Sequence, residues 1–238
     1  MDYLQQYLFI DIETVSGEAD FEKLSPPMQE FWVKKALTLK LEPDVMPDES
    51  YVRRAAIYSE FAKVVCISIG CLMQRDGQWK LYLRTLTGHD EQDLLTRFCK
   101  ALGQFTEREK DLILCGHNIK EFDIPFLCRR MVIHGMDLPK CLDTSSKKPW
   151  EVNHADTMEM WRYGDKKNFT SLGLLAEVLG IPTPKDDIDG SMVGTVYWQE
   201  NNLERIATYC AKDVLTSARV FLRLKNIKDI VFEPVYLT

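Results

Sequence analysis

Four acidic side chains of this sequence stand where an acid is costly unless something compensates its charge. Asp11 and Glu13 lie one residue apart inside the apolar run LFIDIET, Asp123 follows a second apolar run, and Asp213 lies in a core-like stretch near the end. Acids in such surroundings are rarely left unpaired, and a cation is the simplest partner. A donor set of carboxylate oxygens, with little His or Cys nearby, favours Mg²⁺ or Mn²⁺ over zinc.

Such a set of acids predicts a particular kind of chemistry. Two divalent ions about 3.5–4 Å apart activate a water and stabilise the leaving oxygen of a phosphodiester. Each piece also has an ordinary interpretation. Acidic pairs at strand ends are often caps or solvated edges, and HNIKEFD could be a turn that ends in a capping Asp. Tyr209 and Asp213 could equally be an exposed pair on a helix, because residues four apart share a face.

The elements that would position these acids are visible in the hydrophobic pattern. Residues 6–13 predict a strand in which Asp11 and Glu13 share one face, because side chains alternate with period two. Leu8, Ile10 and Ile12 then point to the other face. Asp123 falls where a buried strand runs directly into a helix that Pro125 permits only in its first turn.

The remaining chain alternates strands with helices, which predicts an α/β fold with a mixed sheet. We expect a hairpin, a helix that stops at Gly103, a buried strand, a helix that stops at Gly135, a short strand and two further helices. The corresponding segments are 62–73 with 78–86, 89–105, 111–118, 122–135, 152–157, 168–180 and 202–224. Residues 16–60 are proline-rich, contain two amphipathic helices, and are interpreted as an insertion after the first strand.

Composition limits the class of protein. The 238 residues are 45% hydrophobic and 28% charged, as expected for one globular domain over residues 1–238. No segment is apolar enough to span a membrane, so we expect a cytoplasmic protein with no membrane partner. The seven cysteines lack metal-type spacing and are expected to be reduced. The net charge of -6 argues against binding nucleic acid by bulk positive charge, but a carboxylate metal site is itself acidic.

Three segments together resemble a known superfamily. FIDIET, GHNIKEFDIPFL and YCAKD are similar in order and spacing to the three exonuclease motifs of the DEDD superfamily. A tyrosine four residues before the last Asp resembles the DEDDy branch, which includes the proofreading domains of family-B DNA polymerases. The histidine branch would carry His at the position of Thr208. The chain is most similar to the stand-alone predicted 3'-5' exonucleases related to those domains.

The resemblance implies an RNase H-like fold, with a mixed five-stranded sheet flanked by helices and a helical insertion after the first strand. It implies hydrolysis of the 3'-terminal phosphodiester of single-stranded nucleic acid, DNA favoured over RNA, releasing nucleoside 5'-monophosphates. Four acids would hold two Mg²⁺ or Mn²⁺ ions: Asp11, Glu13, Asp123 and Asp213. Tyr209 would orient the attacking water, and the substrate contacts would be Thr14, Asn118 and Phe122. The alternatives are an exoribonuclease and a non-catalytic nucleic-acid-binding module of the same fold.

A few other residues are candidates for secondary roles. We expect His117 to be a satisfied structural histidine, and we weigh a substrate-side role for Asp156, beside His154 in NHADT. Basic loop residues are more often solvated than bound to nucleic acid, but with two neighbouring aromatic residues they could contact phosphates and bases. These are Lys147, Lys148, Lys166 and Lys167, with Trp150 and Phe169. In the insertion, Phe31 and Trp32 are expected in a core, or alternatively in a lid over the substrate.

Overall fold

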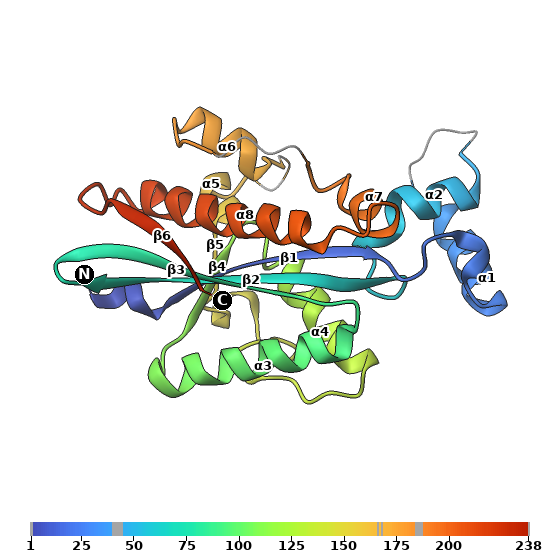
Figure 1. The fold of residues 1–238 in the computed structure, drawn as a ribbon, viewed down its shortest axis with the longest axis horizontal. Helices are drawn as coiled ribbons and strands as arrows, with labels where there is room; N and C mark the ends of the chain where they lie inside the picture. The colour runs from blue at the N-terminus through green and yellow to red at the C-terminus, as the bar shows by residue number, and fades with distance from the viewer. Residues whose placement is uncertain (1, 40–44, 166, 168, 184–187, 238) are drawn as a thin grey trace.

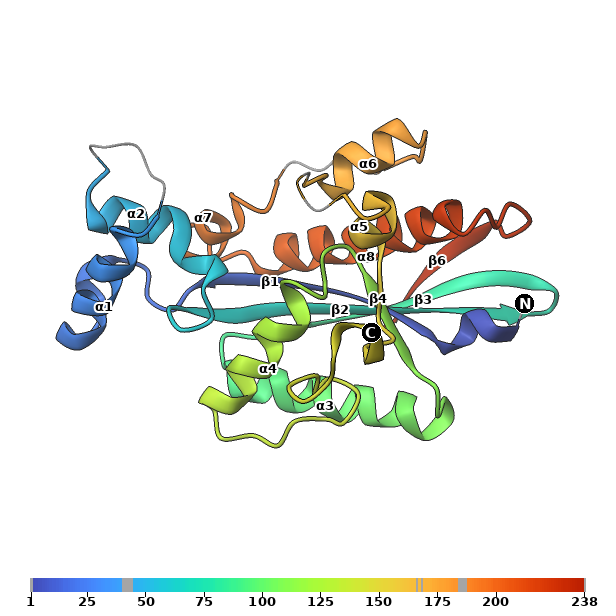
Figure 2. The same cartoon turned by 180° about the vertical axis from the view of Figure 1, so that it is seen from behind.

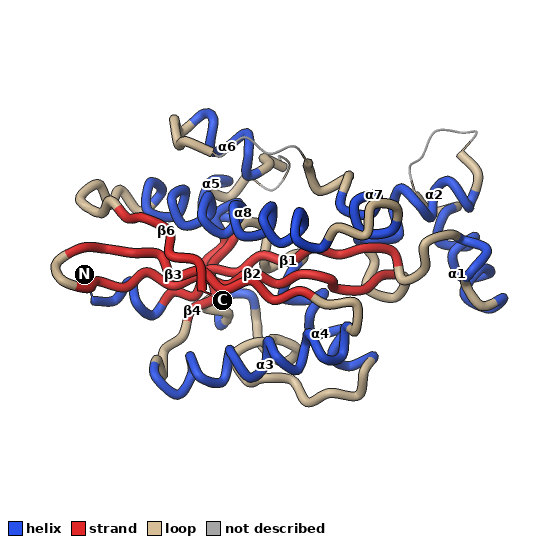
Figure 3. The backbone as a smooth tube through the Cα atoms, in the orientation of Figure 1, coloured by secondary structure: helices blue, strands red, loops and turns tan. Residues whose placement is uncertain are grey.

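A six-stranded mixed sheet forms the centre of the molecule (Figures 1 and 3). The computed structural model describes residues 2–39, 45–165, 167, 169–183 and 188–237. The strand order is β5-β4-β1-β2-β3-β6. The strands are β1 (Tyr7–Ser16), β2 (Ala62–Arg75), β3 (Gln78–Thr87), β4 (Ile113–Gly116), β5 (Ala155–Asp156) and β6 (Phe232–Leu237). With its flanking helices, this mixed sheet is consistent with the RNase H-like exonuclease fold expected from the motifs.

The first strand lies inside the sheet. β1 pairs antiparallel with β2 and parallel with β4, and Asp11 and Glu13 stand opposite Ser68 and Cys66. A bulge between Glu13 and Thr14 shifts the register there. Bulges change the direction of side chains and end regular pairing, so the side chains of β1 no longer alternate regularly between the two faces of the sheet beyond Glu13.

Helices cover both faces of the sheet (Figures 1 and 2). The helices are α1 (Pro26–Ala36), α2 (Pro47–Arg54), α3 (Glu91–Arg108), α4 (Asp123–Ile133), α5 (Thr157–Arg162), α6 (Leu172–Val178), α7 (Val193–Trp198) and α8 (Leu203–Leu224). On one face, α3 and α4 pack on Leu8, Ile10 and Ile12. On the other, Phe9 packs with residues of the long helix α8, so Asp11 and Glu13, which share the face of Phe9, are directed toward α8.

Several elements differ from the sequence prediction. The sheet has one more strand than the five expected, because β6 adds in parallel to β3 at the edge. Its side chains are largely exposed and it contains Pro234, so it lacks the alternating apolar pattern of a strand. Helix α3 runs through Gly103 to Arg108, since a glycine within a helix costs only about 1 kcal/mol. Strands β4 and β5 and helix α6 are shorter than predicted.

The segment between β1 and β2 has a small core of its own. Trp32 is fully buried between α1 and α2, and its indole N–H donates to the Pro47 carbonyl (2.9 Å) and to Ser50 Oγ (3.0 Å). Phe31 is 58% exposed, so its expected place in a core was wrong. Adjacent helical residues point about 100° apart, and only one of the two can face this core.

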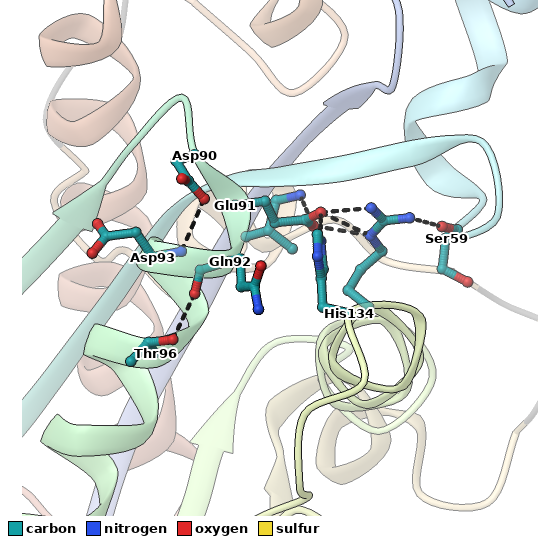
Figure 4. A network of polar contacts seen from close by, with 9 residues as sticks. Ser59, Asp90, Glu91, Gln92, Asp93, Thr96 and His134 are labelled. Atoms are coloured by element: carbon teal, nitrogen blue, oxygen red, sulfur yellow. Dashed lines mark hydrogen bonds and ion pairs between the residues drawn. The ribbon is translucent and has the colours of Figure 1, made fainter.

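A buried carboxylate joins this segment to α3 and α4 (Figure 4). Glu91 accepts hydrogen bonds from Val64 N (2.7 Å), Arg130 Nη2 (2.5 Å) and His134 Nε2 (2.7 Å). Arg130 Nη1 also donates to the Ser59 carbonyl (2.8 Å), just before β2. Burial alone would raise the pKa of Glu91, but these donors lower it below its ordinary value. The network therefore holds the C-terminal half of α4 against the start of β2.

None of the helices in the described residues is both long and apolar enough to cross a bilayer.

Candidate active site

The four acids and the tyrosine singled out in the sequence line one cleft of about 490 Å³. Asp11 and Glu13 reach it from β1, and Asp123 reaches it from the first residue of α4. Tyr209 and Asp213, one turn apart on α8, close it from above the sheet. Three segments that are distant in the sequence thus place their acids around a common space.

Asp123 is fastened directly to the first strand. It is 3% exposed, and its Oδ1 accepts a hydrogen bond from Ile12 N at 3.1 Å. Ile12 lies between Asp11 and Glu13, so one hydrogen bond sets the position of α4's first residue relative to both strand acids.

The acids disfavour one another's ionisation. Burial, and then the charges of Asp213 and Asp123, raise the pKa of Asp11 well above its ordinary value. Burial and the neighbouring Asp11 do the same to the pKa of Glu13, and burial raises the pKa of Asp123 to about 7. Like charges held close in a desolvated cleft require a counter-charge.

The donor set suits a hard divalent cation. One carboxylate oxygen of Asp11 is buried and has no hydrogen-bond partner among the described residues. Ligand atoms of Asp11, Glu13 and Cys210 lie within 4.8 Å of one another. Burial raises the pKa of the Cys210 thiol well above its ordinary value, and its Sγ donates to the Asp11 carbonyl at 3.4 Å. Thiolate sulfur is a soft ligand and hard divalent cations prefer oxygen, so the donors for Mg²⁺ or Mn²⁺ are the oxygens of the acids.

The sequence analysis did not single out Cys210. It follows Tyr209 in YCAKD and precedes Asp213 by three residues, so helical spacing already placed its thiol on the side of the acids. The statement that little Cys lies near the acids was therefore wrong.

Tyr209 keeps its proton in this setting. Its hydroxyl forms a side-chain hydrogen bond with Asp213, and burial, followed by the charge of Asp213, raises the pKa of Tyr209 far above its ordinary value. The phenol is therefore a hydrogen-bond donor, and it is not a base at neutral pH.

The loop between β4 and α4 supplies two of the expected substrate contacts. Asn118 and Phe122 both line the cleft, and Asn118 has a φ of 64°, a conformation that Asn tolerates better than most residues. The Oδ1 atom of Asn118 is buried without a partner in the described part of the chain. Thr14 is different: it does not line the cleft, and its buried hydroxyl donates to the Ala56 carbonyl at 2.7 Å.

Asp156 holds that loop in place. Its carboxylate accepts from the backbone N–H groups of Asn118 and Lys120, both at 3.0 Å, and of Met158 (2.9 Å) and Glu159 (3.3 Å). It also caps α5. Asp156 is thus a residue that positions the loop: its Oδ1 accepts three of these hydrogen bonds and its Oδ2 accepts the fourth, which argues against the substrate-side role weighed above.

His117 is satisfied, as expected. Its Nδ1 lies 2.9 Å from Thr157 Oγ1 and its Nε2 lies 2.8 Å from the Thr170 carbonyl. Burial lowers its pKa, so the ring stays neutral at neutral pH. It lines the cleft as part of its wall.

The basic and aromatic loop residues divide into different places. Phe169 lines the cleft with 67% of its surface exposed, which leaves its ring available for stacking. Lys147 lines a second pocket, whereas Lys148 lies over the Trp150 ring, 5.3 Å from its centroid. Lys167 is exposed, and Lys166 lies outside the described residues.

Comparison with known proteins assigns the chain to a family. The family described as "Predicted 3'-5' exonuclease related to the exonuclease domain of PolB" matches residues 57–237. The matched residues include Asp123, Tyr209 and Asp213, and they begin after Asp11 and Glu13. No curated protein matches the chain. Because the match covers most of its length, the chain belongs to the family of predicted 3'-5' exonucleases related to the exonuclease domain of PolB.

Proposed function

We propose that the protein is a metal-dependent 3'-5' exonuclease that hydrolyses the terminal phosphodiester of single-stranded nucleic acid. The observation that carries the proposal is the convergence of four carboxylates from β1, α4 and α8 in one cleft with Tyr209. DNA is the favoured substrate because the family is related to a DNA polymerase exonuclease domain. The cleft also has an exposed aromatic ring for stacking at its rim, Phe169, which suits an unpaired strand end.

In this proposal each residue has one task. Asp11, Glu13, Asp123 and Asp213 hold two Mg²⁺ or Mn²⁺ ions. When bound, such ions supply an activated water and stabilise the negative charge that develops on the phosphodiester. Tyr209 orients the attacking water through its hydroxyl, which stays protonated and therefore cannot remove a proton from that water.

The substrate contacts follow from what faces the cleft. The unpartnered Oδ1 of Asn118 can accept a hydrogen bond from the terminal nucleotide, and the Phe122 ring can pack against its sugar or base. Thr14 is excluded from this list because its hydroxyl is already bonded to Ala56. The products are nucleoside 5'-monophosphates.

The test uses a 5'-labelled single-stranded DNA oligonucleotide and an RNA of the same sequence, each with Mg²⁺ or Mn²⁺. A 3'-5' exonuclease yields a ladder of shortening labelled products, whereas the opposite polarity releases a labelled mononucleotide at once. Asp213→Ala should abolish the ladder, and Asp93→Ala should not, because Asp93 lies on α3 across the sheet in an exposed pair with Arg97.

The outcomes separate the alternatives. Faster degradation of the RNA would replace DNA by RNA as the substrate. Binding without degradation would make the protein a non-catalytic module. Turnover that survives Asp213→Ala or excess EDTA would refute the metal-dependent mechanism.

A further inference from the structure

A second pocket of about 630 Å³ lies beside the cleft and is not used by the proposed reaction. The two hollows share the loop between β4 and α4, because Asn118 and Phe122 line the cleft while Lys120 and Glu121 line the second pocket. Asn118 and Lys120 are two residues apart, so the chain between them spans at most about 7 Å. We call this hollow the basic pocket, after Lys120, Lys147 and Arg162 in its lining, which also holds the acids Glu121, Asp156 and Glu159.

Two cations of the basic pocket, Lys120 and Arg162, are less exposed than their acidic partners. Lys120 Nζ lies 2.6 Å from Glu159, and the two side chains are 25% and 63% exposed. Arg162 Nη1 lies 3.0 Å from Glu121, with side-chain exposures of 14% and 65%. Pairs whose acid is this exposed contribute little to stability, so an entering anion can displace the glutamates at small cost.

A buried histidine without partners lies in the same wall. His154 is 6% exposed, and neither ring nitrogen has a hydrogen-bond partner within the described residues. Burial, and then the charges of Lys147 and Lys120, lower its pKa to about 4. A neutral imidazole has one N–H donor and one acceptor nitrogen, and buried groups of this kind are nearly always satisfied in folded proteins. The two ring nitrogens of His154, beside two lysines, suit a ligand that carries an anionic group together with a hydroxyl or N–H donor.

We propose that the basic pocket binds a phosphate ester of a nucleotide, with Lys120 and Lys147 on the phosphate oxygens and the His154 ring on the phosphate and an adjoining donor group. The nucleotide part of this inference rests on the proposed function. The phosphate has two sources: a backbone phosphodiester of the substrate strand that crosses the shared loop, or a free nucleoside monophosphate. Both offer the same anion, and they differ in whether a single nucleotide suffices.

The test measures binding in EDTA, where the proposed hydrolysis does not proceed. The probes are thymidine 5'-monophosphate, a short oligo(dT) and inorganic phosphate, measured by titration calorimetry. The variants are Lys147→Ala and, as a matched control, Lys148→Ala, which removes the neighbouring charge that lies over Trp150 and outside the pocket. Both lysines are exposed, so neither change endangers folding.

The expected result is that Lys147→Ala weakens binding of a nucleotide probe about tenfold and lowers its salt slope by about one, while Lys148→Ala changes neither. Inorganic phosphate, which lacks a sugar or base, should bind more weakly than the nucleotide. Lys147-dependent binding of the monophosphate identifies the free nucleotide as the ligand. Lys147-dependent binding of oligo(dT), with no binding of the monophosphate, identifies the substrate strand as the ligand. Equal effects of the two substitutions on every probe would overturn the proposal.

The binding assay is repeated with the Asp213→Ala variant, so that its result does not depend on whether the protein is a nuclease. Lys147-dependent binding in that background supports the basic pocket whether or not the wild-type protein degrades nucleic acid. His154→Gln, which keeps a donor and an acceptor, should bind better than His154→Phe, which has neither. Identical binding by these two variants, with folding verified by circular dichroism, would remove the histidine from the site.

Discussion

A neutral amide at position 123 should make the metal-free protein more stable while it destroys the proposed active site. Asp123 is 3% exposed and shares its cleft with four other acids, Asp11, Glu13, Asp189 and Asp213. Ile12 N, on β1, donates a hydrogen bond to Asp123 Oδ1 at 3.1 Å. The side-chain oxygen of Asn can accept the same hydrogen bond, so Asp123→Asn removes the charge and leaves the local geometry intact.

The sign and size of the effect follow from linkage. Burial raises the pKa of Asp123 from 3.8 to about 7, so the folded protein binds this proton more tightly than the unfolded chain. The resulting stability is fully present below pH 3.8 and is lost as the pH rises through about 7. At 1.36 kcal/mol per pH unit, the whole loss is about 4 kcal/mol. At pH 8 without metal, Asp123→Asn should therefore raise the melting temperature by up to about 8–16 °C.

The assay is thermal unfolding followed by circular dichroism between pH 4 and pH 8, first in EDTA and then with Mn²⁺. The advantage of Asp123→Asn in EDTA should grow with pH and vanish near pH 4. Added Mn²⁺ should stabilise the wild type, by about 2.7 kcal/mol at a hundred times the dissociation constant, and should stabilise the variant less. An advantage that does not vary with pH, or a variant less stable than the wild type in EDTA at pH 8, would refute the reasoning.

Glu91→Gln is the matched control with the opposite sign. Glu91 is as buried as Asp123 but is bonded to Arg130 and His134 (Figure 4), and those donors lower its pKa despite its burial. The stability that the Glu91 carboxylate contributes is present above pH 4.5, and it is lost as the pH falls through the lower pKa that Glu91 has in the folded protein. Removing one partner of such a buried pair costs about 3 kcal/mol, or about 6–12 °C. The loss should shrink, not grow, below pH 4.5.

Two further changes separate orientation from ligation. Tyr209→Phe should slow hydrolysis by about tenfold to hundredfold, which corresponds to the loss of one hydrogen bond to a charged group. Asp213→Ala should slow hydrolysis far more. Equal losses of the single-turnover rate in the two variants would contradict the orienting role of Tyr209. Asp156→Ala leaves the N–H groups of Asn118 and Lys120 without their acceptor, so it should lower stability by about 2 kcal/mol and raise KM more than it lowers kcat. A lower kcat at unchanged KM would instead put Asp156 in the chemistry.

The parts of the site that lie on regular elements could be predicted from the sequence. Period-two alternation placed Asp11 and Glu13 on the face opposite Ile10, and the structure packs Ile10 against α3 and α4 on that opposite side. Spacing by four placed Tyr209 and Asp213 together on a helix, and both line the cleft. These inferences succeed because a helix or strand repeats the same geometry at every residue.

The parts that depend on tertiary contacts could not be predicted. The four backbone N–H groups that donate to Asp156 belong to a loop and a helix end, and no periodic pattern in the sequence predicts these contacts. Glu91 resembles an ordinary first-turn acid until α4 brings Arg130 against it. β6 is an exposed edge strand whose partner, β3, precedes it by more than a hundred residues. Each of these depends on segments that approach one another only in the folded chain.

The mutual repulsion of the acids explains why the fold anchors the elements around them so firmly. Without metal, burial and then the neighbouring acids make Asp11, Glu13 and Asp123 harder to ionise than in water, a cost that separating β1 from α4 would relieve. The hydrogen bond from Ile12 N holds the first turn of α4, and the Glu91 network holds its last turns. Because the Glu91 network uses no proposed metal ligand and Ile12 N bonds to only one oxygen of Asp123, the acids can stay in place before an ion arrives, and the repulsion among them becomes a preference for divalent cations.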